Sequence, residues 1–123
     1  DSKVASLLGE VNLFEGEISA GQFSSSGLNL QLDTKVSGKV ILGLRPEDVR
    51  VGKNETDLIY LGKFTVLVGS YQGGAFRITT KKDSSLLVFI SNVPYKAGET
   101  LDLYAKKGRM KIFDQAGEFV GTA

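Results

Sequence analysis

Residues 58–80 read LIYLGKFTVLVGSYQGGAFRITT, and this stretch decides the class of fold. Its first part, residues 58–69, is rich in β-branched and aromatic side chains, which favour extended strands. Residues 70–74 (SYQGG) then supply the glycines that a tight hairpin turn needs for positive φ angles. Residues 75–80 should therefore return antiparallel to the first part. The stretch predicts a long β-hairpin.

The strand period extends from this hairpin in both directions. Downstream, polar or glycine-containing turns separate expected strands at residues 85–91, 100–106, 109–113 and 118–120. Upstream, apolar and polar residues alternate over residues 14–20 and 28–32. A shorter pair of strands, 39–43 and 48–51, is interrupted at Arg45-Pro46, where the chain must bend or bulge because proline has no N–H to donate.

The spacing of these signals predicts an all-β fold of short antiparallel strands. Turns recur about every 8 to 12 residues, which is typical of a small barrel or sandwich. We favour a closed barrel, because closure removes exposed sheet edges. Residues 3–13 could hold a short helix with Ser2 as its N-cap.

Composition excludes several classes of function. The 123 residues suit one domain, and 15 Lys+Arg against 14 Asp+Glu give no general attraction to nucleic acid or anionic lipid. Without His or Cys there is no Ser-His-Asp or Cys-His nucleophile, no usual zinc site and no disulfide. We therefore expect no catalytic residue and no metal site. The start, Asp1-Ser2-Lys3-Val4, resembles neither a signal peptide nor a translation start, so we expect a piece of a longer protein.

Glycine and carboxylate patterns give no enzyme site. No Gly-x-x-x-x-Gly-Lys-[Ser/Thr] motif is present, and residues 69–74 join two strands instead of opening a helix, so the chain alone should not bind ATP. Glu15 and Glu17 share one strand face, as paired carboxylates would. A solvated strand face explains them better, since no apolar neighbour of the same parity would raise their pKa.

Two further features could bind a partner. Basic residues at Lys81-Lys82 and at 106–111, together with Phe76, Phe89, Tyr104 and Phe113, could imitate the stacking platform of a nucleic-acid-binding barrel, although turn-capping lysines and core aromatics fit better. The loops best suited to grip a small ligand or a partner lie at residues 71–74 and 93–98, unless they are plain connections. Their candidate residues are Tyr71, Gln72, Gly73, Gly74, Tyr95 and Lys96.

Residues 41–49, ILGLRPEDV, carry a family resemblance. They resemble the Gly-[Ile/Leu]-Arg-Pro-Glu signature of the C-terminal TOBE (transport-associated OB) region in ATPase subunits of ABC importers. Residues 8–14 (LGEVNLF) look like the family's "FLGE-x-N" segment, and residues 60–62 (YLG) resemble its "x-LG" strand. Residues 94–103, followed by Ile112-Phe113-Asp114, resemble its "P-x-x-G-x-x-V-x-L … LFD" ending. The four pieces occur in the family's order.

The resemblance implies an OB-like fold and a role in transport. Residues 1–13 would connect a missing N-terminal nucleotide-binding domain, which holds ATP and Mg²⁺, to a regulatory domain at 14–123. This domain would help the subunit form a homodimer beneath two membrane permease subunits, at the cytoplasmic face of the membrane, with no nucleic-acid partner and no cofactor of its own. Gly43, Arg45, Pro46 and Glu47 would form a structural corner, in which Arg45 could pair with Glu47, Asp48 or a carboxylate across the barrel.

Two alternatives remain open from the residues. One is a small-ligand module that binds an oxyanion, and the other is a single-stranded nucleic-acid-binding OB fold. The identity of the solute is not fixed by any motif. The "LGE-x-N" start leans slightly toward iron, polyamine or thiamine importers over sugar importers.

Overall fold

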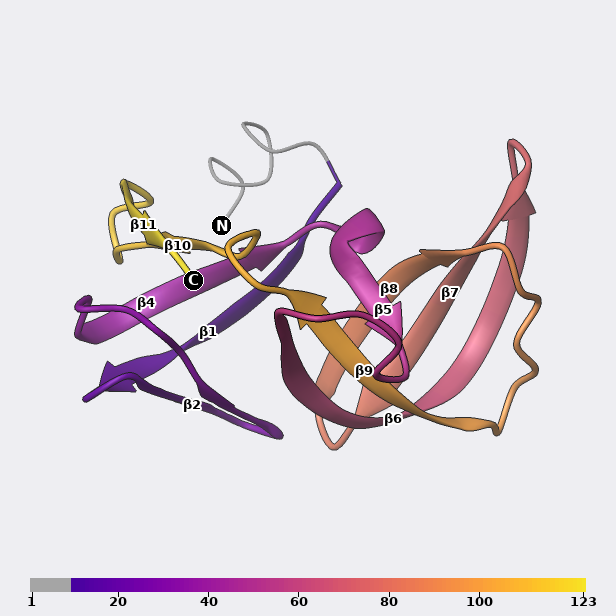
Figure 1. Cartoon of the computed structure of the whole chain (residues 1–123), viewed down its shortest axis with the longest axis horizontal. Helices are drawn as coiled ribbons and strands as arrows, with labels where there is room; N and C mark the ends of the chain where they lie inside the picture. Colours follow the sequence, from indigo (N-terminus) through magenta and orange to yellow (C-terminus); the bar gives the residue numbers. More distant parts are fainter. Residues whose placement is uncertain (1–9) are drawn as a thin grey trace.

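The computed structural model describes residues 10–123 and shows two antiparallel β-sheets (Figure 1). The six-stranded sheet has the order β11-β10-β4-β1-β2-β3, with β1 (Asn12–Ser19), β2 (Gln22–Ser25), β3 (Leu28–Gln31), β4 (Gly38–Leu44), β10 (Lys111–Phe113) and β11 (Phe119–Thr122). The five-stranded sheet has the order β5-β9-β6-β7-β8, with β5 (Val49–Val51), β6 (Leu58–Gln72), β7 (Ala75–Lys82), β8 (Ser85–Ser91) and β9 (Thr100–Lys106). The predicted all-β class is confirmed.

The hairpin predicted at residues 58–80 is confirmed as β6 and β7. The pair Gln72↔Ala75 closes it, and Gly73 and Gly74 make the turn with φ angles of 59° and 92°. These positive values are why glycine is needed here. The turn projects at the upper right of Figure 1. The strand β2 was not expected, because its sequence QFSS contains only one large apolar residue, Phe23.

The bend expected at Arg45-Pro46 is confirmed, and it moves the chain between sheets. β4 pairs with β1 and β10, whereas β5 pairs with β9 in the other sheet. Between them lies a short 3-10 helix, η1 (Pro46–Asp48), with Pro46 in its first turn, where a missing N–H costs nothing. The two runs predicted as a shorter pair are therefore strands of different sheets.

The five-stranded sheet curls strongly into a half-barrel (Figure 1). Its longest strand, β6, carries two irregularities of register against its neighbours, between Tyr60 and Gly62 and between Val66 and Val68. Such bulges bend a strand and increase its twist. The edge strands β5 and β8 approach each other. Within residues 10–123, however, they do not pair through backbone hydrogen bonds. The barrel that we expected to be closed is a half-barrel in which η1 packs against β8.

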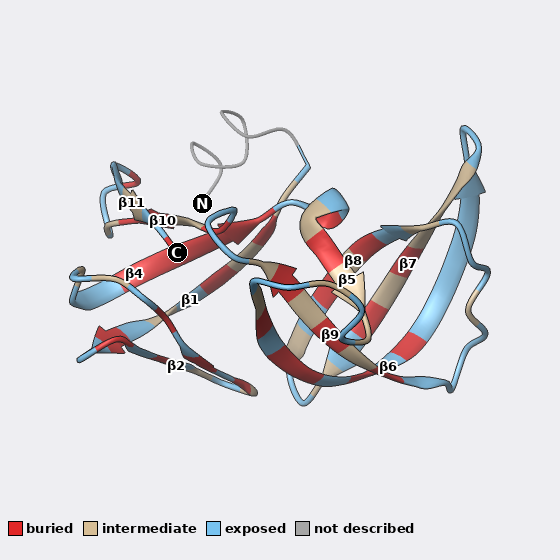
Figure 2. Ribbon diagram, in the orientation of Figure 1, coloured by how far each residue is buried: buried red, intermediate tan, exposed pale blue. Residues whose placement is uncertain are grey.

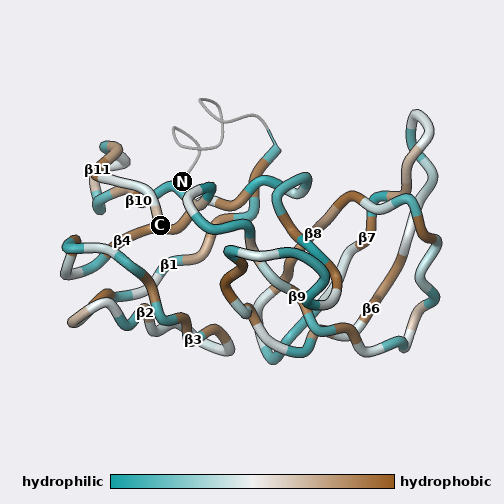
Figure 3. The backbone as a smooth tube through the Cα atoms, viewed as in Figure 1, coloured by the Kyte–Doolittle hydropathy of each residue, from teal (hydrophilic) through white to brown (hydrophobic). Residues whose placement is uncertain are grey.

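One hydrophobic core joins the two sheets. Its large, fully buried side chains come from both, including Phe23 and Leu42 from the six-stranded sheet and Phe64 and Phe89 from the five-stranded sheet. Figure 2 shows buried residues on strands of both halves, and Figure 3 shows hydrophobic stretches at corresponding places. Burial of this apolar area is the main stabilising term of the fold. The two sheets lie side by side in Figure 1 and share this core.

The helix suggested for residues 3–13 falls largely on residues 1–9, which lie outside the described part. Asn12 and Leu13 already belong to β1, so a helix does not reach them. The division between a connecting segment at 1–13 and a domain at 14–123 stays a prediction.

Candidate functional site

Asn12 joins the two sheets through hydrogen bonds of its side-chain amide. Its Nδ2 donates to the carbonyl oxygens of Leu44 (3.1 Å) and Val88 (2.8 Å), and its Oδ1 accepts from the Val88 N–H (2.8 Å). The residue is only 8% exposed. One side chain thus pairs with both backbone groups of a residue on the edge of β8, as a neighbouring strand would.

The Arg-Pro-Glu corner lies at the same place. It begins directly after Leu44, and η1 packs against β8. Pro46 is buried, whereas Arg45 is exposed and makes no ion pair with any residue in 10–123. The pairing suggested for Arg45 is therefore not seen. Arg50 instead holds the loop, because its guanidinium donates to the Glu47 carbonyl oxygen at 2.8 Å and pairs with Glu55 at 2.9 Å.

Glu10 extends this junction to β7. Its carboxylate accepts two hydrogen bonds from the Arg77 guanidinium, at 2.9 Å and 2.6 Å. Glu10 and Asn12 belong to the "LGE-x-N" piece, and Gly43–Glu47 to the "GLRPE" piece. The structure therefore brings two motifs, about 30 residues apart in sequence, together at β8. We call Glu10, Asn12, Leu44 and Val88 the junction.

Asn12 was not predicted as a site residue, although the sequence holds a signal for it. Its parity is that of Phe14, Gly16 and Ile18, which face the core. A polar amide on the core face of a strand must find buried partners. The sequence does not show which backbone groups those partners are, so it does not predict the junction.

A second contact joins the sheets at their turns. The Lys82 Nζ donates to the Gly27 carbonyl oxygen at 2.7 Å, and the Ser85 hydroxyl donates to the Ser26 carbonyl oxygen at 2.6 Å. The stem of Lys82 crosses β6 at Gly62, where an added Cβ would lie 2.8 Å from the Lys82 Cε. Gly62 therefore leaves the space through which this lysine reaches the other sheet.

The predicted partner loops lie on the five-stranded sheet, away from the junction. Tyr71 is exposed at the hairpin end and packs edge-on against Phe76, with ring centroids 5.2 Å apart. Tyr95 packs against Phe89 at 6.0 Å, and the Lys96 N–H donates to the Glu99 carboxylate. The five hollows described on the surface of residues 10–123 are lined by other residues. A ligand-gripping role for these loops stays a prediction.

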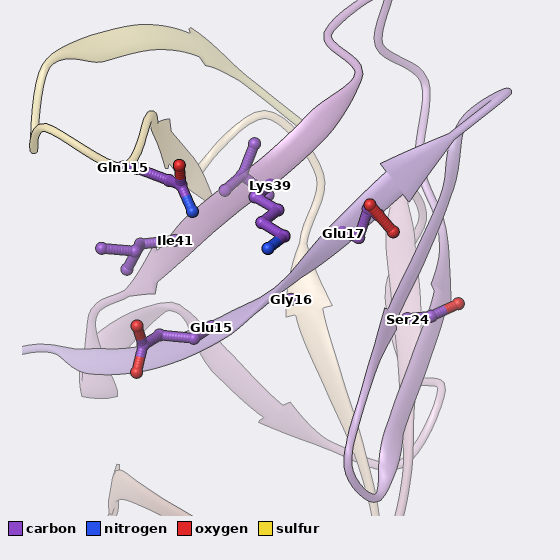
Figure 4. Close-up of a pocket in the computed structure, with 8 residues that line it drawn as sticks. Glu15, Gly16, Glu17, Ser24, Lys39, Ile41 and Gln115 are labelled. Atoms are coloured by element: carbon purple, nitrogen blue, oxygen red, sulfur yellow. The ribbon is translucent and has the colours of Figure 1, made fainter.

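Glu15 and Glu17 line the largest of these hollows, about 570 Å³ in volume, on the outer face of the six-stranded sheet (Figure 4). Lys39 and Ile41 of β4 and Gln115 lie on the opposite side. Neither carboxylate forms an ion pair within the described part of the chain. No group of three metal-ligating side chains occurs in residues 10–123. The arrangement gives a polar hollow without a catalytic constellation.

The aromatic platform considered for nucleic-acid binding does not form. Phe89 and Phe113 are buried, and Phe113 belongs to the other sheet. Tyr104 lies on the outer face of the five-stranded sheet beside Tyr60, with ring centroids 5.1 Å apart. Stacking of successive bases needs neighbouring exposed rings, so the structure does not favour this alternative.

Charged groups on that outer face pair with one another. The Tyr60 hydroxyl donates to Asp102 at 2.8 Å and Lys63 lies 3.1 Å from the same oxygen, so the pKa of Asp102 is lowered, first by the tyrosine and then by the lysine. The same hydrogen bond raises the pKa of Tyr60. Hydrogen bonds from Lys106 and Arg50 lower the pKa of Glu55. Each shift stabilises the protonation state that completes the pair.

Comparisons with known proteins support the resemblance seen in the sequence. The family model of the glucose ABC transporter C-terminal domain matches residues 56–114. The glucose import ATP-binding protein GlcV of Saccharolobus solfataricus is 37% identical over 118 residues, which cover 92% of this chain and 33% of GlcV. This chain thus spans about a third of the length of that relative. The names of the family model and of the relative both contain glucose. They therefore do not support the slight preference for iron, polyamine or thiamine importers that the sequence suggested.

No helix among residues 10–123 is long and apolar enough to cross a membrane. The matched region, the order of the motifs and the two-sheet fold all point to the same assignment. The resemblance to the C-terminal domain of an ABC importer ATP-binding subunit is therefore confirmed, with the glucose ABC transporter C-terminal domain as the matching family model.

Proposed function

We propose that this chain is the regulatory and dimerisation domain of the ATP-binding subunit of a glucose importer. The observation that carries the proposal is the junction, where the two motifs that resemble those of ABC importer ATPase subunits meet at β8. A segment that enters a domain and is fixed at its core can pass a displacement on to both sheets. The name of the relative supports glucose as the solute.

The ATP and Mg²⁺ of the reaction are held, in this proposal, by a nucleotide-binding part that precedes the domain. Its partners are that nucleotide-binding part, a second copy of the subunit and the membrane permease subunits. The subunit lies at the cytoplasmic face of the membrane. The domain takes no part in the chemistry of hydrolysis and instead biases the arrangement of the two nucleotide-binding parts. A ligand or protein that prefers one arrangement shifts the equilibrium by its difference in affinity, typically about 1 to 3 kcal/mol.

ATP hydrolysis by the full-length subunit tests the proposal. The intact subunit is compared with one that ends before Asn12, each assembled with the permease subunits in vesicles and supplied with the solute-binding protein and glucose. We expect the shortened subunit to hydrolyse ATP but to lose the response to glucose and to dimerise more weakly by sedimentation. An unchanged response and an unchanged dimer would remove the regulatory and dimerising roles.

A further inference from the structure

We infer that the outward side of β6, β7 and β8 is the surface that contacts the nucleotide-binding part of the same subunit. The inference rests on the proposed function and adds the location of the contact. The surface, called here the outer apolar face, consists of Val68, Thr79, Val88, Ile90, Leu86 and Arg77.

The register of the strands makes this face continuous. Val68 pairs with Thr79, and Thr79 pairs with Val88 across three neighbouring strands. Arg77 pairs with Ile90 in the adjacent row. Val68 and Ile90 are 57% and 38% exposed, although both are large apolar residues. Contiguous exposed apolar residues on a sheet indicate a contact surface more often than single ones do.

The other half of the same outer side is different. There, Arg50, Tyr60, Lys63, Asp102 and Lys106 bond with one another or with Glu55. Those polar groups already bond to partners within the chain. The apolar side chains over β6–β8 are instead exposed to water. A partner that covered the polar half would have to break these pairs, and one that covered the apolar half would gain by removing it from water.

The position of Glu10 indicates which part of the protein contacts the outer apolar face. It lies at the start of the described residues and is held by Arg77, which is part of the outer apolar face. Asn12, two residues later, bonds to the backbone of Val88 at the free edge of β8, beside this face. The polypeptide thus enters the domain beside this face, at the edge of β8. The relative GlcV extends well beyond the matched third, and the part that precedes such an entrance is tethered beside the face at a high effective concentration.

Photocrosslinking in the full-length subunit tests the contact. The photoreactive residue p-benzoylphenylalanine replaces Ile90 or Val68 in separate variants, and the control replaces Val120, which is 41% exposed on β11 and so matches Ile90. After irradiation, crosslinked peptides are identified by mass spectrometry. Mixtures of isotope-labelled and unlabelled subunits separate links within one polypeptide from links between copies.

We expect positions 68 and 90 to link to peptides that precede Asp1 in the same full-length polypeptide, at a yield at least several-fold above position 120. Arg77→Glu should lower this yield, and the added change Glu10→Arg should restore it. Equal yields from 90 and 120 would overturn the inference, and so would links from 68 and 90 only between labelled and unlabelled copies. If the subunit hydrolyses ATP and the glucose response needs this domain, such results refute the contact alone. If the full-length polypeptide does not hydrolyse ATP, the proposed function itself fails.

Discussion

At the scale of single residues, position 12 requires an asparagine more strictly than its neighbours require their own side chains. It is the buried amide whose three hydrogen bonds end on backbone groups of Leu44 and Val88. A buried donor or acceptor that loses its partner costs more than the bond itself contributes. The stability of the junction therefore depends on this amide more than on the charged residues around it.

We expect Asn12→Ala to lower the free energy of unfolding by about 3 kcal/mol, because it removes three hydrogen bonds, two of them to the backbone of Val88, at about 1 to 3 kcal/mol for each group that loses its partner, partly offset by water. Urea unfolding measures the change. The matched control is Asn29→Ala, since Asn29 is exposed on β3, and it should cost no more than about 0.5 kcal/mol. Equal losses in the two variants would show that the hydrogen bonds of Asn12 do not stabilise the junction.

The strand period of the sequence predicted that position 12 faces the core, but not what it bonds. Periodicity reports which side of a strand a residue occupies, and it carries no information on a segment 76 residues away, such as Val88. Arg45 shows the opposite case. Its charge suggested a pair beside the corner, yet the corner is held by the proline geometry and by Arg50.

At the scale of elements, the pair β6–β9 contains the hydrogen bond between Tyr60 and Asp102. The pKa of Asp102 is lowered, so its contribution is fully present above the ordinary carboxyl pKa of about 3.9 and is lost as the pH falls through the lower folded value. The pKa of Tyr60 is raised, so its contribution is present below about 10 and is lost as the pH rises through the higher folded value.

Asp102→Asn should therefore destabilise the protein at neutral pH and have little effect below the lowered pKa of Asp102. It should also bring the pKa of Tyr60 down toward its ordinary value, because the acceptor loses its charge. Absorbance titration of tyrosinate, with Tyr60→Phe as reference, measures the second effect. Asp33→Asn, at an exposed carboxylate, is the control and should leave the titration unchanged. An unshifted Tyr60 in Asp102→Asn would contradict the assignment.

Most strands were predictable because their burial follows a period of two, as in β9 with Leu101, Leu103 and Ala105 inward. The bulges in β6 were not, because a local extra residue leaves the composition of a strand unchanged. The corner was predictable from Pro46, whereas the assignment of β4 and β5 to different sheets depends on long-range packing. Local sequence patterns therefore predict the strands. They do not predict the bulges and the long-range packing that curl the half-barrel.

At the scale of the whole molecule, the two sheets should unfold together, since they share one core and are joined at two places. The four tyrosines, at positions 60, 71, 95 and 104, all lie in the five-stranded half, and the chain has no tryptophan. Tyrosine fluorescence therefore reports that half alone, whereas far-ultraviolet circular dichroism reports both sheets.

We expect the two signals to follow one urea curve with the same midpoint, as two-state unfolding requires. Lys82→Met, which removes one connection between the sheets, should lower the common midpoint without separating the curves. Two separate midpoints in the unmodified protein would show that the halves are independent units.

The bond between Asn12 and Val88 also bears on how such domains change through evolution. Every amino acid except proline offers the same N–H and C=O at position 88, so that position can vary while asparagine at 12 must persist. Two positions in contact would then show no correlated substitutions. Methods that find contacts from paired changes between relatives should therefore miss the connection that joins the two sheets.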